Sequence, residues 1–210
     1  MTNSEPGRDC PLCPRLVGYR HEQRALHPDW FNAPVPSIGT AQAELLIVGL
    51  APGVQGANRT GRPFTGDFAG DLLYNTLIKF GFADGVFKAD PNDGLTLKGT
   101  IITNAVRCVP PQNKPVPAEI KTCNQFLSAR IASLPKLRAI VALGHIAHDA
   151  ALTALVERKA AFPFAHGAQH ALPRLKLFDS YHCSRYNTNT RVLTPDMFEN
   201  IFRAVRNYLG

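Results

Sequence analysis

Four cysteines are spaced as candidate metal ligands in this 210-residue sequence. Cys10 and Cys13 have the CxxC spacing that lets two thiolates face one ion, whereas Cys108 and Cys123 lie far along the chain and join them only through folding. Because the chain carries no export signal, a disulfide framework is not expected. We favour a four-cysteine metal centre over four separate buried thiols, and the spacing alone does not separate zinc from an iron–sulfur cluster.

A glycine-rich loop at residues 50–67 is a second candidate for chemistry. Its glycines let backbone N–H groups approach a ligand closely, and an Asn-Arg-Thr run adds donors between them. The loop ends at Asp67, which is either a functional carboxylate or only the N-cap of the helix that follows, and spacing alone favours the cap. Phe64 is either an apolar plug under the loop or a flat surface on which a planar ligand stacks.

Two further polar loops follow predicted strands, at residues 108–116 and 181–191. The first is stiffened by prolines and holds Asn113, which alone is typical of a turn. The second begins with Tyr-His, and a lone histidine such as His182 is more often a core or surface residue than a functional one. Asn104, inside the strand before residue 108, is either paired in the core or displayed to a ligand at the strand end.

The segment at residues 160–173 also contains histidines that have to be considered as metal ligands. His166 and His170 lack the HxxxH spacing that places two ligands on one helix face. We therefore interpret both as ordinary loop residues.

Apolar runs and helical periodicity place these loops in a fold. Strands are predicted at residues 44–48, 100–106, 137–143 and 175–180, and helices at 11–25, 67–80, 117–134, 145–156 and 194–209. Repeated strand–loop–helix units predict an α/β fold with three αβα layers around a mostly parallel four-stranded sheet, formed by residues 1–210 as a single domain. Function is then expected at the carboxyl ends of the strands, where the three polar loops lie.

Net charge and hydropathy restrict the partners of the protein. A formal charge of +7 and a sequence pI near 9.4 suggest a polyanionic partner, although an evenly spread charge would mean only solubility. No apolar stretch approaches the ~18 residues of a membrane span, and no N-terminal segment joins a basic region to an apolar run. We expect a cytoplasmic monomer without a membrane partner, associated with the nucleoid if the source is bacterial.

Together the three loops resemble motifs of the uracil-DNA glycosylase superfamily, specifically family 5, the UDGb class. The matching segments are GLAPGVQGANRTGRPFTGD from Gly49, NAVRCVPPQNKP from Asn104 and YHCSRYNT from Tyr181. The resemblance covers nearly the whole chain and implies a uracil-DNA glycosylase-like fold. It also implies that a damaged base is flipped out of DNA and that water cleaves its bond to the sugar, leaving an abasic site.

The resemblance assigns catalytic roles residue by residue. Leu50 occupies the position where other families carry a polar or acidic residue that handles the water, so this role passes to Asp67. Asn113 is expected to assist, and His182 to donate to the uracil oxygen. The residues implied in base binding are Phe64, Asn104, Gly49, Leu50 and Ala51.

Contacts with DNA and with a cofactor are implied in the same way. Arg185 and Tyr186 resemble the segment that is inserted into the duplex in place of the flipped base. The full set of implied DNA-binding residues is Arg59, Arg62, Lys114, Ser184, Arg185, Tyr186 and Asn187. A [4Fe-4S] cluster is implied on Cys10, Cys13, Cys108 and Cys123, whereas Cys183 is expected to be a small buried hydrophobic residue.

Two alternatives accompany this interpretation. Without a polar residue at Leu50 the site is expected to accept hypoxanthine or modified uracils besides uracil. Double-stranded DNA is the expected substrate, and single-stranded DNA is a second candidate. A different class of protein, a metal-containing module that binds nucleic acid without turnover, also fits the positive charge and the cysteines. Substitution of Asp67 or His182 separates the two, because only an enzyme loses rate.

Overall fold

The structure is a computed structural model that describes residues 4–210. Its main sheet has the strand order β1-β5-β2-β6-β8-β7. The strands are β1 (Ile38–Gly39), β2 (Leu45–Gly49), β5 (Thr100–Asn104), β6 (Ala139–Leu143), β7 (Gln169–Ala171) and β8 (Lys176–Ser180). The central strands β5, β2, β6 and β8 run parallel, and β1 and β7 pair antiparallel at the two edges. The parallel strands confirm the predicted sheet, whereas the edge strands are too short to produce a recognisable periodicity.

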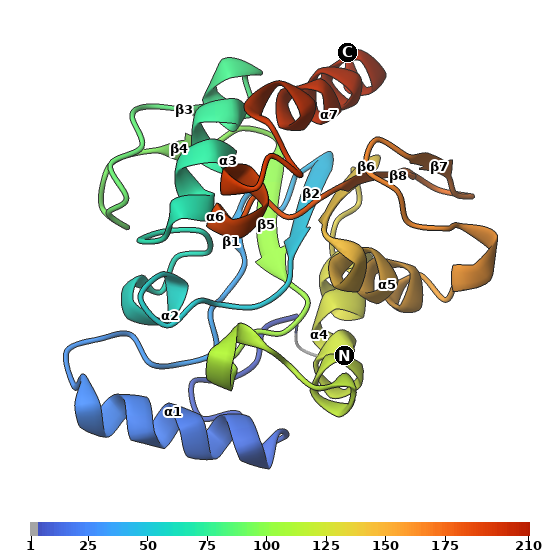
Figure 1. Ribbon diagram of the computed structural model, residues 1–210. Helices are drawn as coiled ribbons and strands as arrows, with labels where there is room; N and C mark the ends of the chain where they lie inside the picture. The colour runs from blue at the N-terminus through green and yellow to red at the C-terminus, as the bar shows by residue number, and fades with distance from the viewer. Residues whose placement is uncertain (1–3) are drawn as a thin grey trace.

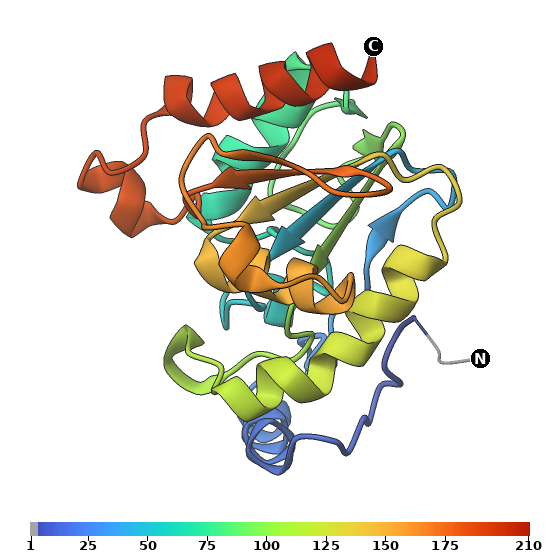
Figure 2. The same ribbon diagram turned by 90° about the vertical axis from the view of Figure 1, so that its right-hand side faces the viewer.

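Helices cover both faces of the sheet, as the three-layer prediction requires (Figures 1 and 2). The long helices are α1 (Pro14–Leu26), α3 (Phe68–Lys79), α4 (Pro117–Ala132), α5 (His145–Ala154) and α7 (Pro195–Leu209). Leu45 and Ile47 of β2 pack with α3 and α7, whereas Leu46 and Val48 pack with α4 and α5. Alternate residues of one strand thus enter opposite cores, as the pleat dictates.

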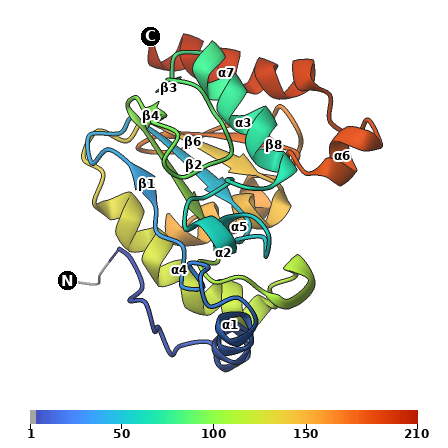
Figure 3. The same cartoon turned by 90° about the vertical axis from the view of Figure 1, so that its left-hand side faces the viewer.

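The N-terminal helix α1 lies outside these layers, against α4 (Figures 2 and 3). Arg15 joins the two helices through an ion pair with Glu119 at 2.8 Å. The face that α1 buries carries Leu16, Arg20 and Gln23, whereas Leu26 is 68% exposed. This helix thus buries a charged residue, Arg20, beside the cysteines.

Short elements lie within the predicted loops. They are α2 (Ala57–Thr60), η1 (Pro111–Asn113), η2 (Lys159–Ala161), α6 (Arg185–Asn189) and the β3–β4 hairpin (Ala83–Asp84 with Thr96–Leu97). A single helical turn or a two-residue strand is too short to give a periodic signal in a sequence, so these elements were not predicted. Among the described residues, no helix is both long and apolar enough to cross a membrane.

Candidate active site

A small cavity lies at the carboxyl edge of the parallel strands, where the first and third predicted loops meet. Its volume is about 40 Å³, more than the ~10–15 Å³ that one water molecule needs. The residues that line it are Ala51, Pro52, Gly53, Ala57, Phe64, Asp67, Ala69, Asn104 and His182. The fold therefore brings together Asp67, His182, Phe64 and Asn104, which the sequence had marked in separate segments.

Asp67 occupies the N-cap position of α3, and its side chain lies near the first-turn N–H groups without forming a short capping hydrogen bond. One carboxylate oxygen, Oδ1, is buried and has no hydrogen-bond partner among residues 4–210. Burial raises the pKa of Asp67, and the nearby N–H groups of Gly70 and Ala69 offset this only in part. A buried carboxylate oxygen without a protein partner is suited to accept a hydrogen bond from a water or a ligand in the cavity.

The glycine-rich loop is shaped around this carboxylate. A Cβ atom added at Gly56 would lie 2.4 Å from Oδ2 of Asp67, and one added at Gly53 would lie 3.2 Å away. No side chain at residue 56 fits without displacing the carboxylate. The glycines thus let the backbone approach the acid closely, as the loop composition suggested.

His182 lies two residues after the end of β8 and lines the cavity together with residues of the glycine-rich loop. Burial lowers the pKa of His182 to about 4, so the imidazole is neutral at pH 7 and carries one N–H donor. Its ring faces that of Phe64, with centroids 6.1 Å apart and planes inclined by 28°. The carbonyl oxygen of His182 accepts a hydrogen bond from Nδ2 of Asn187 at 2.8 Å, which fixes the backbone.

Phe64 forms one wall of the cavity in a backbone conformation that is rare for a bulky residue. Its φ is +53°, in the left-handed region where such residues are outliers that mark turns or functional sites. A Cβ atom at Gly49 would lie 2.6 Å from the Phe64 ring and 2.4 Å from Oδ1 of Asn104. A Cβ atom at Gly70 would lie 1.9 Å from the Phe64 carbonyl oxygen. Gly49 and Gly70 are therefore needed to seat Phe64, and Gly70 is a functional glycine that sequence reasoning missed.

Three predicted site residues, Asn113, Leu50 and Gly49, do not line the cavity. Asn113 lies on the exposed turn η1 with φ +56°, and the structure does not bring it to Asp67 or His182. Leu50 contributes its backbone, because its carbonyl oxygen accepts the Val106 N–H at 3.0 Å. Stiffening by prolines suggested a fixed position for Asn113, but it did not indicate the direction in which the turn points.

The structure corrects one predicted phosphate contact, Arg62. Its guanidinium group is buried and forms an ion pair with Asp93 at 2.8 Å. It also lies over the rings of Tyr74 and Phe87, at 4.8 and 5.5 Å from their centroids. A cation that is already paired and desolvated is not available to a DNA phosphate, so we assign Arg62 to the support of the loop.

The remaining DNA-binding candidates lie near the cavity rim or at the surface. Arg59 and Lys114 are exposed. Ser184 caps the short helix α6 by accepting the Asn187 N–H at 3.3 Å. Arg185 stands 5.4 Å from the ring centroid of Phe68. The side chain of the neighbouring Tyr186 is 74% exposed, which is a large exposed fraction for an aromatic residue.

The four cysteines at residues 10, 13, 108 and 123 line one pocket between α1, α4 and the loop after β5. One tetrahedral zinc ion with Zn–S bonds of about 2.3 Å would hold thiolates ~3.8 Å apart. No three of these sulfur atoms lie within 4.8 Å of one another, so the pocket fits a larger group better than a single ion. Cys183 lies elsewhere, fully buried in the core between the sheet and α3, as predicted.

Two buried arginines lie beside these thiols. A guanidinium nitrogen of Arg20 is 3.8 Å from Sγ of Cys108, and another donates to the Cys10 carbonyl oxygen at 3.1 Å. The backbone N–H of Arg107 donates to Sγ of Cys123 at 3.3 Å. Such donors and positive charges are suited to stabilise thiolates that share a metal group.

Residues 36–206 match the model of the uracil DNA glycosylase superfamily. A protein of Thermus thermophilus named type-5 uracil-DNA glycosylase is 45% identical, over 96% of this chain and 94% of its own length. Proteins of the same name from Mycobacterium bovis and Pyrobaculum aerophilum are 43% and 36% identical, over 96% and 93% of this chain and 78% and 87% of their own lengths.

Proposed function

Because the chain belongs to the uracil DNA glycosylase superfamily, we propose that it is a DNA repair hydrolase that releases uracil from DNA. The observation that carries this proposal is the meeting of Asp67, His182, Phe64 and Asn104 in one cavity at the carboxyl edge of the sheet. Asp67 offers a carboxylate that stabilises positive charge, and His182 offers a neutral N–H donor that stabilises negative charge. Hydrolysis of an N-glycosidic bond needs both.

The proposed mechanism uses water as the nucleophile. The departing pyrimidine gains negative charge, and a neutral His182 stabilises it by donating a hydrogen bond to a carbonyl oxygen of the base. The sugar becomes oxocarbenium-like, and ionised Asp67 stabilises this positive charge and orients the attacking water. The product is an abasic site. Asn113 has no contact with the cavity, so the mechanism rests on Asp67 and His182 alone.

The flipped base is proposed to stack on Phe64 and to meet the side chain of Asn104 at its polar edge. Ala51, Ala57 and Ala69 offer only methyl groups to the rest of the cavity wall. This part of the wall has no polar side chain that would be left without a hydrogen bond if a base other than uracil were bound. We therefore include hypoxanthine and modified uracils among the substrates.

DNA is proposed to bind across the rim formed by the glycine-rich loop and α6. Arg59, Lys114, Ser184 and Asn187 contact the backbone, which positions the duplex without reading its sequence. Tyr186, exposed beside Arg185, enters the gap that the flipped nucleotide leaves. We propose that the protein acts as a monomer, because the site is built from a single chain.

The direct test is incubation with duplexes that contain one uracil opposite guanine or adenine, followed by alkaline cleavage at abasic sites. We expect strand breaks at the uracil in both duplexes. Binding of the duplexes without any abasic site would refute the glycosylase proposal and favour the non-catalytic nucleic-acid-binding module. Parallel single-turnover reactions on hypoxanthine and on single-stranded uracil DNA test the broader substrate range, and strict selectivity for uracil would contradict it.

We also propose that Cys10, Cys13, Cys108 and Cys123 hold a [4Fe-4S] cluster. The support is the convergence of four thiols on one pocket, where no three of their sulfur atoms lie within 4.8 Å of one another. When bound, the cluster supplies a covalent tie between α1, α4 and the loop after β5, and hydrolysis itself needs no electron transfer. Arg20 and Arg107 would help to hold the thiolates through the contacts described above.

Removal of one ligand tests the cluster. We expect anaerobically purified protein to be brown with about four irons per chain, and Cys123→Ser to lose the colour and melt at a lower temperature. Cys183→Ser is the matched control, because this buried cysteine lies outside the pocket and should leave the iron content unchanged. Colourless protein with one zinc per chain would refute the cluster and leave the glycosylase proposal standing.

A further inference from the structure

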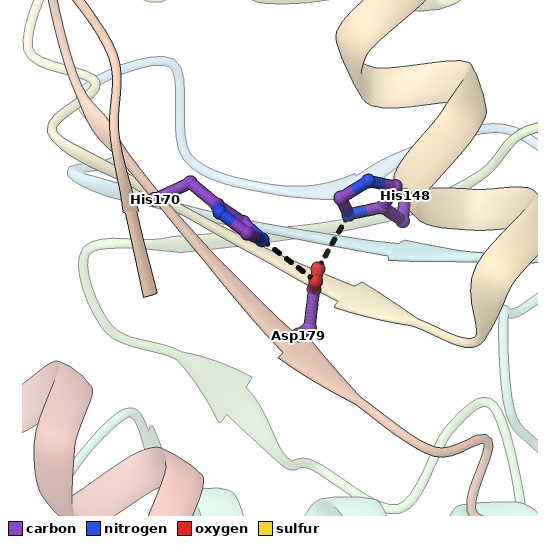
Figure 4. A group of neighbouring side chains, drawn as sticks. All are labelled: His148, His170 and Asp179. Atoms are coloured by element: carbon purple, nitrogen blue, oxygen red, sulfur yellow. Dashed lines mark hydrogen bonds and ion pairs between the residues drawn. The ribbon is translucent and has the colours of Figure 1, made fainter. Parts of the chain in front are cut away.

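A polar group lies buried beside the proposed active site without taking part in it. His148 of α5, His170 of β7 and Asp179 of β8 point toward one another (Figure 4). Their side chains are 1%, 12% and 0% exposed. Nδ1 of His148 lies 2.7 Å from Oδ1 of Asp179, and Nε2 of His170 lies 3.0 Å from Oδ2. The interpretation of His170 as an ordinary loop residue was therefore wrong.

The surroundings of His148 fix its number of protons. Nε2 lies 2.8 Å from the carbonyl oxygen of Phe162, which can only accept a hydrogen bond. Nε2 therefore carries hydrogen. A neutral imidazole has one N–H, so Nδ1 would then turn a lone pair toward the Asp179 carboxylate. Two lone pairs at 2.7 Å repel each other, so a cation has to lie between them, and this cation is either a metal ion or a second proton.

The geometry favours the proton. Both distances to Asp179 are those of N–H···O hydrogen bonds, and the 2.7 Å distance to His148 is that of a charged donor. Two ligands on one zinc ion, each at about 2.0–2.1 Å, would lie ~3.3 Å apart. If His148 is protonated at both nitrogens and His170 donates through Nε2, each oxygen of the Asp179 carboxylate accepts one hydrogen bond. Both N–H groups of the His148 ring then have an acceptor, Asp179 and the Phe162 carbonyl oxygen.

We propose that His148 is an imidazolium ion whose bond to Asp179 positions the end of β8, and with it the active-site residue His182. The charge state stands on the local geometry, whereas the positioning role rests on the proposed function. His148 is thus a positioning residue, since it does not line the cavity.

The neighbouring charges are compatible with this state. Burial lowers the pKa of His148, but the hydrogen bond and charge of Asp179 outweigh it, and the Phe162 carbonyl and Asp149 add to the rise. The other ionisable groups close by are His145 on α5, His170 on β7 and Lys159 on η2, and Lys159 is paired with Asp149 at 3.0 Å.

A short path connects the pair to His182. Asp179 and Ser180 end β8 just before Tyr181 and His182. The Ser180 carbonyl oxygen accepts a hydrogen bond from the backbone N–H of Gly144 at 2.7 Å. The Gly144 carbonyl oxygen in turn accepts one from the backbone N–H of His148 at 3.1 Å. A Cβ atom at Gly144 would lie 3.5 Å from Cβ of His182. The first turn of α5 therefore contacts both ends of the segment that carries His182.

The charge state is tested by ¹⁵N NMR of the histidine side chains in the full-length protein. We expect both ring nitrogens of His148 to be protonated at pH 7. Asp179→Asn should convert His148 to its neutral form, because the new amide donates to Nδ1 and still accepts from His170. The number of hydrogen bonds is then unchanged. A neutral His148 in the wild type, or stoichiometric binding of added Zn²⁺ that His170→Ala abolishes and Cys123→Ser does not, would overturn the proposal.

The positioning role is tested by single-turnover kinetics of the same proteins. Asp179→Ala removes the anchor and should lower the rate of uracil release by at least tenfold at unchanged DNA affinity, since small displacements of catalytic groups are costly. Asp179→Asn should stay within about threefold of the wild type, because it keeps the geometry. Asp196→Asn, which removes an exposed carboxylate on α7 away from His148, is the matched control.

The pH dependence of the rate of uracil release distinguishes positioning by a charged His148 from a purely structural role, which would not change with pH. A raised pKa in the folded protein means that the stabilisation is complete below pH 6.5, the ordinary value, and is lost as pH rises through the folded-state pKa. The wild type should therefore lose rate and stability at alkaline pH, and Asp179→Asn should not. Equal rates for Asp179→Ala and the wild type would refute the positioning role. If no protein releases uracil, the proposed function fails while the NMR result still decides the charge state.

Discussion

Asp67→Asn is expected to lower the single-turnover rate of uracil release by about 10²- to 10⁴-fold, the range that a positioned acid–base group contributes. Asparagine has nearly the same shape, so the cavity and α3 are retained. It lacks the negative charge that orients water and stabilises the oxocarbenium-like sugar. DNA affinity should be unchanged or slightly higher, because the substitution removes a negative charge near the phosphates.

The pH profile makes this prediction specific to the carboxylate. Burial raises the pKa of Asp67 above its ordinary value of 3.8. The ionised form is the active one, so the rate of the wild type should fall as pH decreases through the raised pKa. Asp67→Asn should have a low rate without this acid limb. A variant that keeps the wild-type rate or its acid limb would remove Asp67 from the mechanism.

Gly56→Ala provides a graded version of the same experiment. The added methyl group would lie 2.4 Å from Oδ2 of Asp67, so the carboxylate has to move while its charge remains. A displacement of about 1 Å costs on the order of 10²-fold in rate. Gly18→Ala on α1, where nothing lies within 4 Å of the new methyl group, is the control for a glycine that has no such contact. Equal rates for the two variants would show that the position of the carboxylate is not critical.

The parallel sheet and the site at its edge were predictable because both depend on strong local signals. Buried parallel strands give continuous apolar runs, and β2 and β6 each contain one, whereas β5 and β8 each contain a pair of consecutive large apolar residues. Parallel strands end at the same edge of the sheet, so the loops that carry Asp67 and His182 had to converge. The N-cap of α7 was equally clear, since Thr194 precedes Pro195 and its side chain accepts the Met197 N–H.

The errors concern side chains whose partner lies on another element of the fold. Arg62 looked like a phosphate contact in a polar loop, but its charge is paired with Asp93, which lies in an excursion with no periodic pattern. His170 looked like a loop residue because its own strand β7 is only three residues long and its partner Asp179 lies on the next strand, β8. In each case the sequence displays one half of an ion pair, and only the tertiary fold identifies the other half.

Substitution of His182 separates hydrogen-bond donation from charge. His182→Ala is expected to lower the rate by about 10²- to 10³-fold, the usual cost of one donor to a developing anion. His182→Gln should recover part of the loss, because an amide N–H donates without a charge. Tyr181→Phe, at the preceding residue and outside the cavity, is the control. Equal losses in the alanine and glutamine variants would contradict donation as the role of His182.

The same residue has a distinct signature in the stability of the protein. The pKa of His182 is lowered to about 4, from an ordinary value of 6.5. The unfolded chain therefore binds more protons than the folded one between these values, and His182 makes stability fall as pH decreases from 6.5 toward 4. Thermal melts of His182→Gln should lose this part of the acid dependence. A dependence identical to that of the wild type would mean that His182 is not held neutral. The group that meets the uracil oxygen would then be an imidazolium ion, and the pH–rate profile would have to show the titration of His182.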